Sequence, residues 1–216
     1  MIKAVIFDLD GTLLNTSVEI NLLINKALSK FNLRQISLKQ TIEYIGNGAK
    51  KLVERAVPEE YSHLTEKVFE YFSKIYAECD NSNTTLYDGE EEVLYYLKQN
   101  GVKLAIVTNK PQAAANAVYK KLLSKFNFDL VIGQSEKFPV KPNPQSTLSA
   151  INSLGVEKEE CLFVGDGETD VQTAINSKVN CVAVLWGYRN REQLKEVGAV
   201  NFAKSYCELK DFIKKF

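Results

Sequence analysis

Two aspartates follow the first apolar run of the chain. Asp8 and Asp10 stand in the sequence Asp-Leu-Asp-Gly-Thr, directly after the apolar residues 4–7. Residues two apart on an extended strand point to the same face, so both carboxylates would lie together where the strand ends. Gly11 would let the chain turn sharply there. A simple turn is the alternative, because Asp, Gly and Thr all favour turns and helix caps.

A second pair of acids, Asp166 and Asp170, follows the apolar residues 161–164. If a helix begins near Glu168, Asp166 lies at or just before its cap and Asp170 lies in its first turn. The helix dipole favours carboxylates there, which is also the purely structural explanation. Together with the first pair, these acids would form a dense negative pocket that requires a cation. Oxygen ligands without Cys or His indicate Mg²⁺.

Two further segments could bind a phosphate group. The sequence Thr-Asn-Lys begins at Thr108, after the apolar residues 103–107. A hydroxyl and free backbone N–H groups ahead of a helix suit a phosphate. Lys141 precedes the sequence Pro-Asn-Pro, whose prolines would fix the backbone before the next helix. Each segment also has an ordinary explanation, a helix cap for the first and a solvated surface lysine for the second.

The composition argues against several classes of function. The 216 residues include 27 Lys plus Arg and 27 Asp plus Glu, so the formal net charge is zero. A nucleic-acid or anionic-membrane partner is therefore not expected. No apolar run approaches the ~20 residues that span a bilayer. The apolar stretch at the N-terminus is too short for a signal peptide, so we expect a cytoplasmic protein.

The cysteines and the histidine do not suggest a reactive or metal-binding group. The four cysteines contain no CxxC pair, which argues against a clustered zinc site. The one histidine, His63, lies in a polar stretch. A Ser-His-Asp mechanism is therefore not expected.

Short apolar runs rich in branched side chains alternate with amphipathic segments, which predicts strands alternating with helices. The strands are expected at residues 4–7, 103–107, 130–132, 161–164 and 181–185, and the helices near 89–100, 111–125, 144–154 and 169–177. This alternation indicates an α/β fold with a Rossmann-like, doubly wound parallel sheet. Ligands bind at the carboxyl ends of such strands, where the paired acids lie.

The region after the first strand interrupts this alternation. It carries apolar residues at helical spacing and no clear strand. We therefore predict an α-helical cap domain over residues 15–84, inserted into a core domain of residues 1–14 and 85–216. The segments 15–17 and 80–85 would be its hinges.

The four segments resemble the motifs of the haloacid dehalogenase superfamily of phosphatases, in that family's order and after the expected strands. The matching positions are Asp8 and Asp10, Thr108 and Asn109, Lys141, and Asp166 and Asp170. The inserted helices are similar to the small α-helical cap of that family. Residues 45–56 look like the cap segment of phosphoglycolate phosphatases. Asn15 and Gly167 depart from the pattern, since many relatives have an acid and a serine there.

The resemblance implies a magnesium-dependent phosphatase that acts on a small-molecule phosphate through an aspartyl-phosphate intermediate on Asp8. Asp10 would protonate the leaving group and then activate water. The carboxylates of Asp8 and Asp166 and the backbone carbonyl of Asp10 would hold Mg²⁺. Asp170 would orient a metal-bound water or Lys141.

Phosphoryl binding would fall to Thr108, Asn109 and Lys141, and closure of the cap would exclude bulk water. Asp10 favours phosphate esters or anhydrides, because dehalogenases and phosphonate-cleaving relatives lack this acid. A pyrophosphatase, a sugar-phosphate phosphatase and a non-catalytic binding scaffold remain alternatives. The chain is expected to act as a monomer or a homodimer.

The cap segment suggests phosphoglycolate as the substrate. Asn47 lies in a Gly-Asn-Gly turn before a helix expected to begin near Ala49, and Lys51 and Arg55 share a face of that helix. The N-terminus of that helix, together with Arg55 or failing that Lys51, would receive the substrate carboxylate. The alternative is that both cations are solvated, as exposed Lys and Arg usually are.

Overall fold

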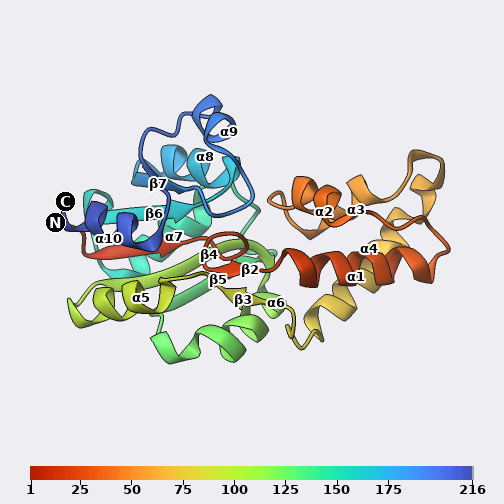
Figure 1. Cartoon of the computed structure of the whole chain (residues 1–216), viewed down its shortest axis with the longest axis horizontal. Helices are drawn as coiled ribbons and strands as arrows, with labels where there is room; N and C mark the ends of the chain where they lie inside the picture. The colour runs from red at the N-terminus through yellow and green to blue at the C-terminus, as the bar shows by residue number, and fades with distance from the viewer. Residues whose placement is uncertain (216) are drawn as a thin grey trace.

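A parallel sheet forms the centre of the protein, as the computed structural model of residues 1–215 shows (Figure 1). Within these residues the sheet has six strands in the order β5-β4-β1-β6-β7-β8. The strands are β1 (Ala4–Phe7), β4 (Lys103–Pro111), β5 (Leu130–Gln134), β6 (Cys161–Gly165), β7 (Asn180–Val184) and β8 (Phe202–Ala203). All neighbouring strands are parallel, which confirms the predicted α/β fold.

The central position of β1 determines where the acids lie. Phe7 pairs with Ile106 of β4 on one side and with Val164 of β6 on the other. The carboxyl end of β1 is therefore level with Ile106 of β4 and Val164 of β6. The amide of Asp8 continues the ladder by donating to the carbonyl oxygen of Val164 at 2.9 Å. Side chains that follow these strands consequently meet at one edge of the sheet.

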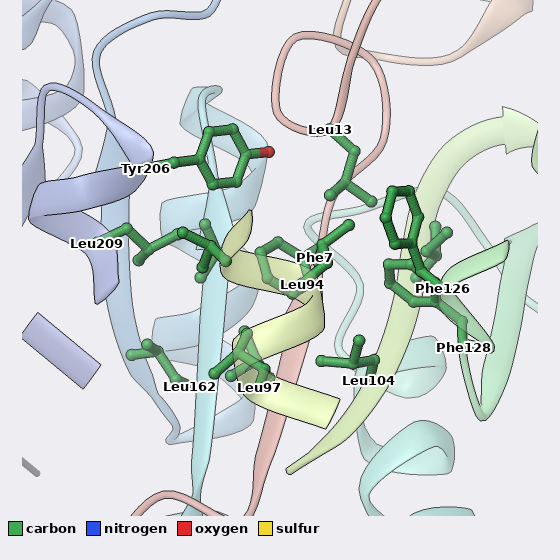
Figure 2. Packing of buried hydrophobic residues seen from close by; sticks show 14 of the residues in the cluster. Phe7, Leu13, Leu94, Leu97, Leu104, Phe126, Phe128, Leu162, Tyr206 and Leu209 are labelled. Atoms are coloured by element: carbon green, nitrogen blue, oxygen red, sulfur yellow. The ribbon is translucent and has the colours of Figure 1, made fainter. Parts of the chain in front are cut away.

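Helices cover both faces of the sheet. On one face, Phe7, Leu104 and Leu162 pack against α5 (Glu90–Gln99) and α10 (Tyr206–Lys214), as Figure 2 shows. The opposite face packs against α7 (Gln145–Leu154) and α8 (Glu168–Ser177). Alternate residues of β1 point to opposite faces, and all four are buried. A strand buried on both faces appears in the sequence as an uninterrupted apolar run, which is why these strands were predicted correctly.

Some elements differ from the sequence-based prediction. The strand β8 and the helices α9 (Arg191–Glu196) and α10 were not predicted. The helix expected over residues 111–125 is divided into α6 (Gln112–Val118), a π-helical turn, η2 (Tyr119–Leu123), and a 3₁₀ turn, η3 (Ser124–Phe126). Apolar periodicity continues through these turns, so it could not reveal the change in helix type.

The inserted region is helical and has its own apolar core. Its helices are α1 (Ser17–Lys30), α2 (Leu38–Tyr44), α3 (Ala49–Ala56) and α4 (Thr65–Ala77), with a 3₁₀ segment, η1 (Glu59–Leu64), before α4. We call α1 to α4 the cap helices. They lie together beyond the carboxyl ends of the strands (Figure 1). Buried residues such as Leu28, Val53 and Phe72 form their shared cluster.

The two connections between the sheet and the cap helices are paired with each other. The strands β2 (Leu14–Asn15) and β3 (Thr85–Leu86) form a short antiparallel ladder. The predicted boundaries after residues 14 and 84 fall in or beside this ladder and stay predictions. Among residues 1–215, no helix combines the length and the apolar character that crossing a membrane requires.

Candidate active site

Three carboxylates meet at the carboxyl ends of β1 and β6. One oxygen each from Asp8, Asp166 and Asp170 lie within 4.8 Å of one another. Asp8 directly follows β1, Asp166 directly follows β6, and Asp170 lies in the first turn of α8. The structure therefore brings the two predicted acid segments together. The side chain of Asp10 is not part of this group.

Asp166 is held in a fixed orientation. Thr12 Oγ1 donates to its Oδ1 and the amide of Tyr188 donates to its Oδ2, both at 2.8 Å. Gly11 and Gly187 pack so closely that a Cβ at either position would lie 2.3 Å from an Asp166 side-chain atom. Burial, followed by the charges of nearby carboxylates, raises the pKa of Asp166 to about 8. A cation bound here would favour the ionised form.

Lys141 lies between the other two acids. Its Nζ is 2.6 Å from Asp170 Oδ1 and 2.8 Å from Asp8 Oδ1, and it donates to the carbonyl oxygen of Val107 at 3.0 Å. Although burial opposes its charge, Asp170 and Asp8 raise the pKa of Lys141. Lys141 is therefore a buried cation at neutral pH, as its predicted role requires. The expected contact between Asp170 and Lys141 is present.

The carboxylate of Asp8 combines burial with incomplete hydrogen bonding. Within residues 1–215, its Oδ1 accepts no hydrogen bond of good geometry, despite the nearby Lys141 ammonium. Burial, then the Asp170 charge, raises its pKa to about 7. An unsatisfied buried carboxylate oxygen is costly unless a cation binds it.

The donor set fits Mg²⁺. Asp8, Asp166 and Asp170 present oxygen atoms, which Mg²⁺ prefers. The four aspartates of the site outnumber its two lysines, Lys141 and Lys110. The remaining negative charge would be balanced by a divalent cation.

The side chain of Asn109 is hydrogen-bonded to backbone groups. The amide of Lys141 donates to its Oδ1 at 2.6 Å, and its Nδ2 donates to the carbonyl oxygens of Gly46 at 2.9 Å and Lys141 at 3.2 Å. The side-chain amide of Asn109 is thus engaged in hydrogen bonds with backbone groups, so direct substrate binding by this amide is not supported. Asn109 positions Lys141 and ties the loop before α3 to the sheet. Thr108 is buried and lines the cavity beside Asp8.

A small cavity lies between the acids and the cap helices. Its volume is about 40 Å³, and we call it the acid cavity. Both sides contribute to its wall: Asp8, Asp10, Thr108, Asn109, Lys110 and Pro111 from the sheet side, and Ile20, Ile45, Gly46, Gly48, Ala49, Leu52 and Tyr76 from the cap side.

The predicted carboxylate-binding residues do not line this cavity. Asn47 and Arg55 line a second cavity of about 730 Å³, whose wall contains none of the four aspartates. Arg55 donates to the carbonyl oxygen of Tyr44 at 2.9 Å. Lys51 is exposed and pairs with Glu54 at 2.6 Å. Neither Lys51 nor Arg55 lines the acid cavity, so the structure does not support the predicted contact between these cations and a substrate at Asp8.

Lys110 is a further residue of the site, and its role does not follow from the sequence pattern. Its side chain is 1% exposed and its Nζ lies 3.0 Å from Asp10 Oδ1. Nζ also donates to the hydroxyl of Tyr76 in α4. Its position directly after Thr108 and Asn109 is the sequence feature that could have indicated a role in the site. Its burial depends on α4, which is distant in sequence.

Arg189 is a second residue that sequence reasoning missed. It follows β7, and its Nε donates to both carboxylate oxygens of Glu168 at 3.0 and 2.9 Å. Its Nη1 and Nη2 donate to the carbonyl oxygens of Ile42 and Ile45 at 3.0 and 2.7 Å. Arg189 therefore joins the sheet side to the end of α2. No local sequence pattern identifies these partners, because all of them come from other elements.

Comparison with known proteins agrees with this arrangement. Residues 5–184 match the family described as haloacid dehalogenase-like hydrolases. The chain is 32% identical to Phosphoglycolate phosphatase 1 of Pseudomonas aeruginosa, over 90% of this chain and 73% of the relative. It is 31% identical to a phosphoglycolate phosphatase of Colwellia psychrerythraea, over 91% and 90% of the two chains. A crystal structure from Lactobacillus delbrueckii subsp. bulgaricus, 30% identical, is similar with a TM-score of 0.91 over 98% of each chain.

Proposed function

The chain belongs to the haloacid dehalogenase-like hydrolases and is a phosphoric monoester hydrolase, and we propose that it converts 2-phosphoglycolate to glycolate and phosphate. The observation that carries the reaction is the buried arrangement of Asp8, Lys141 and the acids after β6. The substrate is supported by the two phosphoglycolate phosphatases that match about nine tenths of this chain.

Asp8 is the proposed nucleophile. It is the carboxylate at the end of the central strand, and it lines the acid cavity. Its attack on phosphorus would give an aspartyl phosphate and release the glycolate oxygen. Phosphoryl transfer depends mainly on positioning and charge stabilisation, so a carboxylate is a sufficient nucleophile. Lys141, 2.8 Å from Asp8 Oδ1, would reduce the repulsion between Asp8 and the phosphate and stabilise the charge on the transferring oxygens.

Asp10 is the proposed general acid and base. It lines the same cavity as Asp8 but has a different partner, Lys110. Asp10 would protonate the leaving oxygen, and then take a proton from the water that hydrolyses the aspartyl phosphate. Lys110 holds the carboxylate in place between these two steps.

We propose that Asp8, Asp166 and the backbone carbonyl of Asp10 hold Mg²⁺. When bound, Mg²⁺ would neutralise part of the charge of the phosphoryl group and of the acids. Asp170, held by Lys141 and by the amide of Gly167 at 2.9 Å, would orient the surrounding groups. Thr108, which lines the cavity and whose Oγ1 accepts from the amide of Lys110 at 3.2 Å, would contact a phosphoryl oxygen.

Pyrophosphate and sugar phosphates are the alternative substrates within the same chemistry. The acid cavity of about 40 Å³ favours a short substrate over a sugar phosphate. A non-catalytic scaffold would not require Asp8 and Asp10 to form separate ion pairs with Lys141 and Lys110 beside further carboxylates.

A direct assay tests the proposal. Initial rates with Mg²⁺ would be compared for 2-phosphoglycolate, pyrophosphate, glucose 6-phosphate and p-nitrophenyl phosphate. We expect the highest kcat/KM for 2-phosphoglycolate and no turnover after chelation of the metal. Faster hydrolysis of pyrophosphate or the sugar phosphate would refute the substrate but retain the phosphatase. Absence of turnover for all four would refute the enzymatic function.

A further inference from the structure

Lys110 is a buried cation in the wall of the acid cavity. Its Nζ is 3.0 Å from Asp10 Oδ1, donates to the Tyr76 hydroxyl and lies 4.3 Å from the centre of the Tyr76 ring. Lysine is rarely buried without a partner, and Asp10 provides one. The pair fixes the ammonium group beside the space in which the substrate would bind.

Two donors in this wall are available to a ligand. A lysine ammonium has three hydrogens. Among the described residues, Asp10 and Tyr76 are the two that accept from Lys110 Nζ, so one hydrogen remains. The Tyr76 hydroxyl accepts from Lys110, which is its one hydrogen bond within residues 1–215, so its own hydrogen is left to donate. Tyr76 and Lys110 both line the acid cavity together with Asp8.

The other buried cations near the site are already engaged. Lys141 contacts Asp8, Asp170 and the carbonyl oxygen of Val107. Arg189 uses its guanidinium for Glu168 and for backbone carbonyls at the end of α2. Among the residues that line the acid cavity, Lys110 is therefore the cation that keeps a hydrogen for a ligand.

The size of the cavity limits what Lys110 can bind. About 40 Å³ holds roughly three to four water molecules, if one water requires about 10–15 Å³ of such volume. A carboxymethyl group occupies a similar space, whereas a sugar ring does not. Ile20, Ile45 and Leu52 also line the cavity, and they provide no hydrogen bonds from their side chains.

We propose that Lys110 and Tyr76 together bind the carboxylate of the substrate and select short phosphate esters that carry this second anionic group. This inference rests on the proposed function, because it requires the phosphoryl group at Asp8. A carboxylate would receive one charge-assisted hydrogen bond from Lys110 and a second hydrogen bond from Tyr76. Lys110 belongs to β4 and Tyr76 to α4, so an anionic substrate would join the sheet to a cap helix.

The test compares two substrates that differ in this group. Values of kcat/KM would be measured for 2-phosphoglycolate and for ethyl phosphate, with wild type, Lys110→Met and Tyr76→Phe. Lys110→Met also removes the partner of Asp10, so both substrates lose rate and the ratio of their kcat/KM values is the informative quantity. We expect that ratio to fall about 10- to 100-fold in Lys110→Met and about 3- to 10-fold in Tyr76→Phe, mainly through KM for 2-phosphoglycolate.

Lys50→Met is the matched control. Lys50 is an exposed cation of α3 that pairs with Glu66 at 2.6 Å, and it does not line the acid cavity. Its removal should leave the ratio unchanged. If Lys110→Met does not fold, the ratio of kcat/KM values in Tyr76→Phe alone tests the inference. An unchanged ratio in every folded variant would overturn the inference while the proposed substrate stands. A wild-type enzyme that does not prefer 2-phosphoglycolate over ethyl phosphate would overturn both.

Discussion

Asp8 and Asp10 lie two residues apart in the chain and have separate cationic partners in the structure. Lys141 lies 2.8 Å from Asp8, and Lys110 lies 3.0 Å from Asp10. Both lysine side chains are at most 2% exposed. Two adjacent acids can perform different steps when their environments differ, which is the physical basis for assigning one as nucleophile and the other as acid and base.

Replacing the proposed nucleophile should abolish turnover. We expect Asp8→Asn to lower kcat by roughly 10³-fold or more, because the amide cannot form the phosphoenzyme. The same change at Asp211, whose side chain is 59% exposed, is the control and should leave kcat unchanged. Mass spectrometry of acid-quenched wild-type enzyme should locate the phosphoryl group on Asp8. A phosphoenzyme at another residue would contradict the assignment.

Replacing the proposed acid should have a smaller effect that depends on the substrate. Asp10→Asn is expected to lower kcat/KM roughly 10²- to 10⁴-fold for ethyl phosphate, the usual contribution of general acid–base catalysis. The loss should be smaller for p-nitrophenyl phosphate, because its leaving group needs little protonation. Steady-state rates for both substrates in the same preparation measure the difference. Equal losses would show that Asp10 does not protonate the leaving group.

The cap helices and the sheet are joined at several separate places. The β2–β3 ladder lies in the two chain connections between the sheet and the cap helices. Asn109 Nδ2 binds the carbonyl oxygen of Gly46, and Arg189 binds the carbonyl oxygens at the end of α2. A cation is favourable at the carboxyl end of a helix, where the last carbonyls have no partners within the helix. These contacts hold the Gly-Asn-Gly loop over the acids.

Loss of the Arg189 contacts should weaken this closed arrangement. We expect Arg189→Met to raise KM for 2-phosphoglycolate about 10-fold and to increase protease cleavage near residues 38–48. Arg191→Met is the matched control, since the Arg191 guanidinium stacks 4.2 Å from the Phe202 ring centre. Steady-state kinetics and limited proteolysis provide the measurements. Similar effects of both changes would show that Arg189 acts through general stability and not through the cap helices.

The distribution of charge over the whole molecule is uneven despite a net charge of zero. Four aspartates and two lysines are concentrated at one edge of the sheet. Burial and mutual repulsion raise the pKa of Asp8 to about 7 and that of Asp166 to about 8. Without a metal ion, the folded protein therefore keeps protons on these groups that the unfolded chain has released.

This linkage predicts how stability depends on pH and on Mg²⁺. Between the ordinary aspartate pKa near 4 and about pH 8, the metal-free folded state binds more protons than the unfolded state, so these groups lower stability as pH rises. Mg²⁺ favours the ionised carboxylates and should counter this loss. We expect Mg²⁺ to raise Tm more at about pH 8 than at about pH 6, relative to EDTA.

Thermal unfolding of wild type and Asp166→Asn measures this effect. The variant lacks a proposed ligand, so its Tm should respond weakly to Mg²⁺ at both pH values. An equal Tm increase in the wild type at the two pH values would contradict the linkage.

Oligomeric state, predicted as monomer or homodimer, can be measured on the same samples by light scattering.

The sequence by itself determined the α/β fold and the positions of the acids. Strands buried on both faces require continuous apolar runs, and β1 and β6 show these runs with Asp8 and Asp166 directly after them. The helical nature of the inserted region also followed from the spacing of its apolar residues. The short strand β8 left no such pattern, because only Ala203 of its two residues is buried.

Only the tertiary structure decided which cations serve which acids. Helical spacing predicts that Lys51 and Arg55 share one face, but it does not show what that face contacts. The fold leaves both residues outside the acid cavity and instead buries Lys110 between Asp10 of the sheet edge and Tyr76 of α4. These partners are 100 and 34 residues away from Lys110 in the chain. Such pairings depend on how the cap helices pack over the sheet, and local sequence patterns do not contain that information.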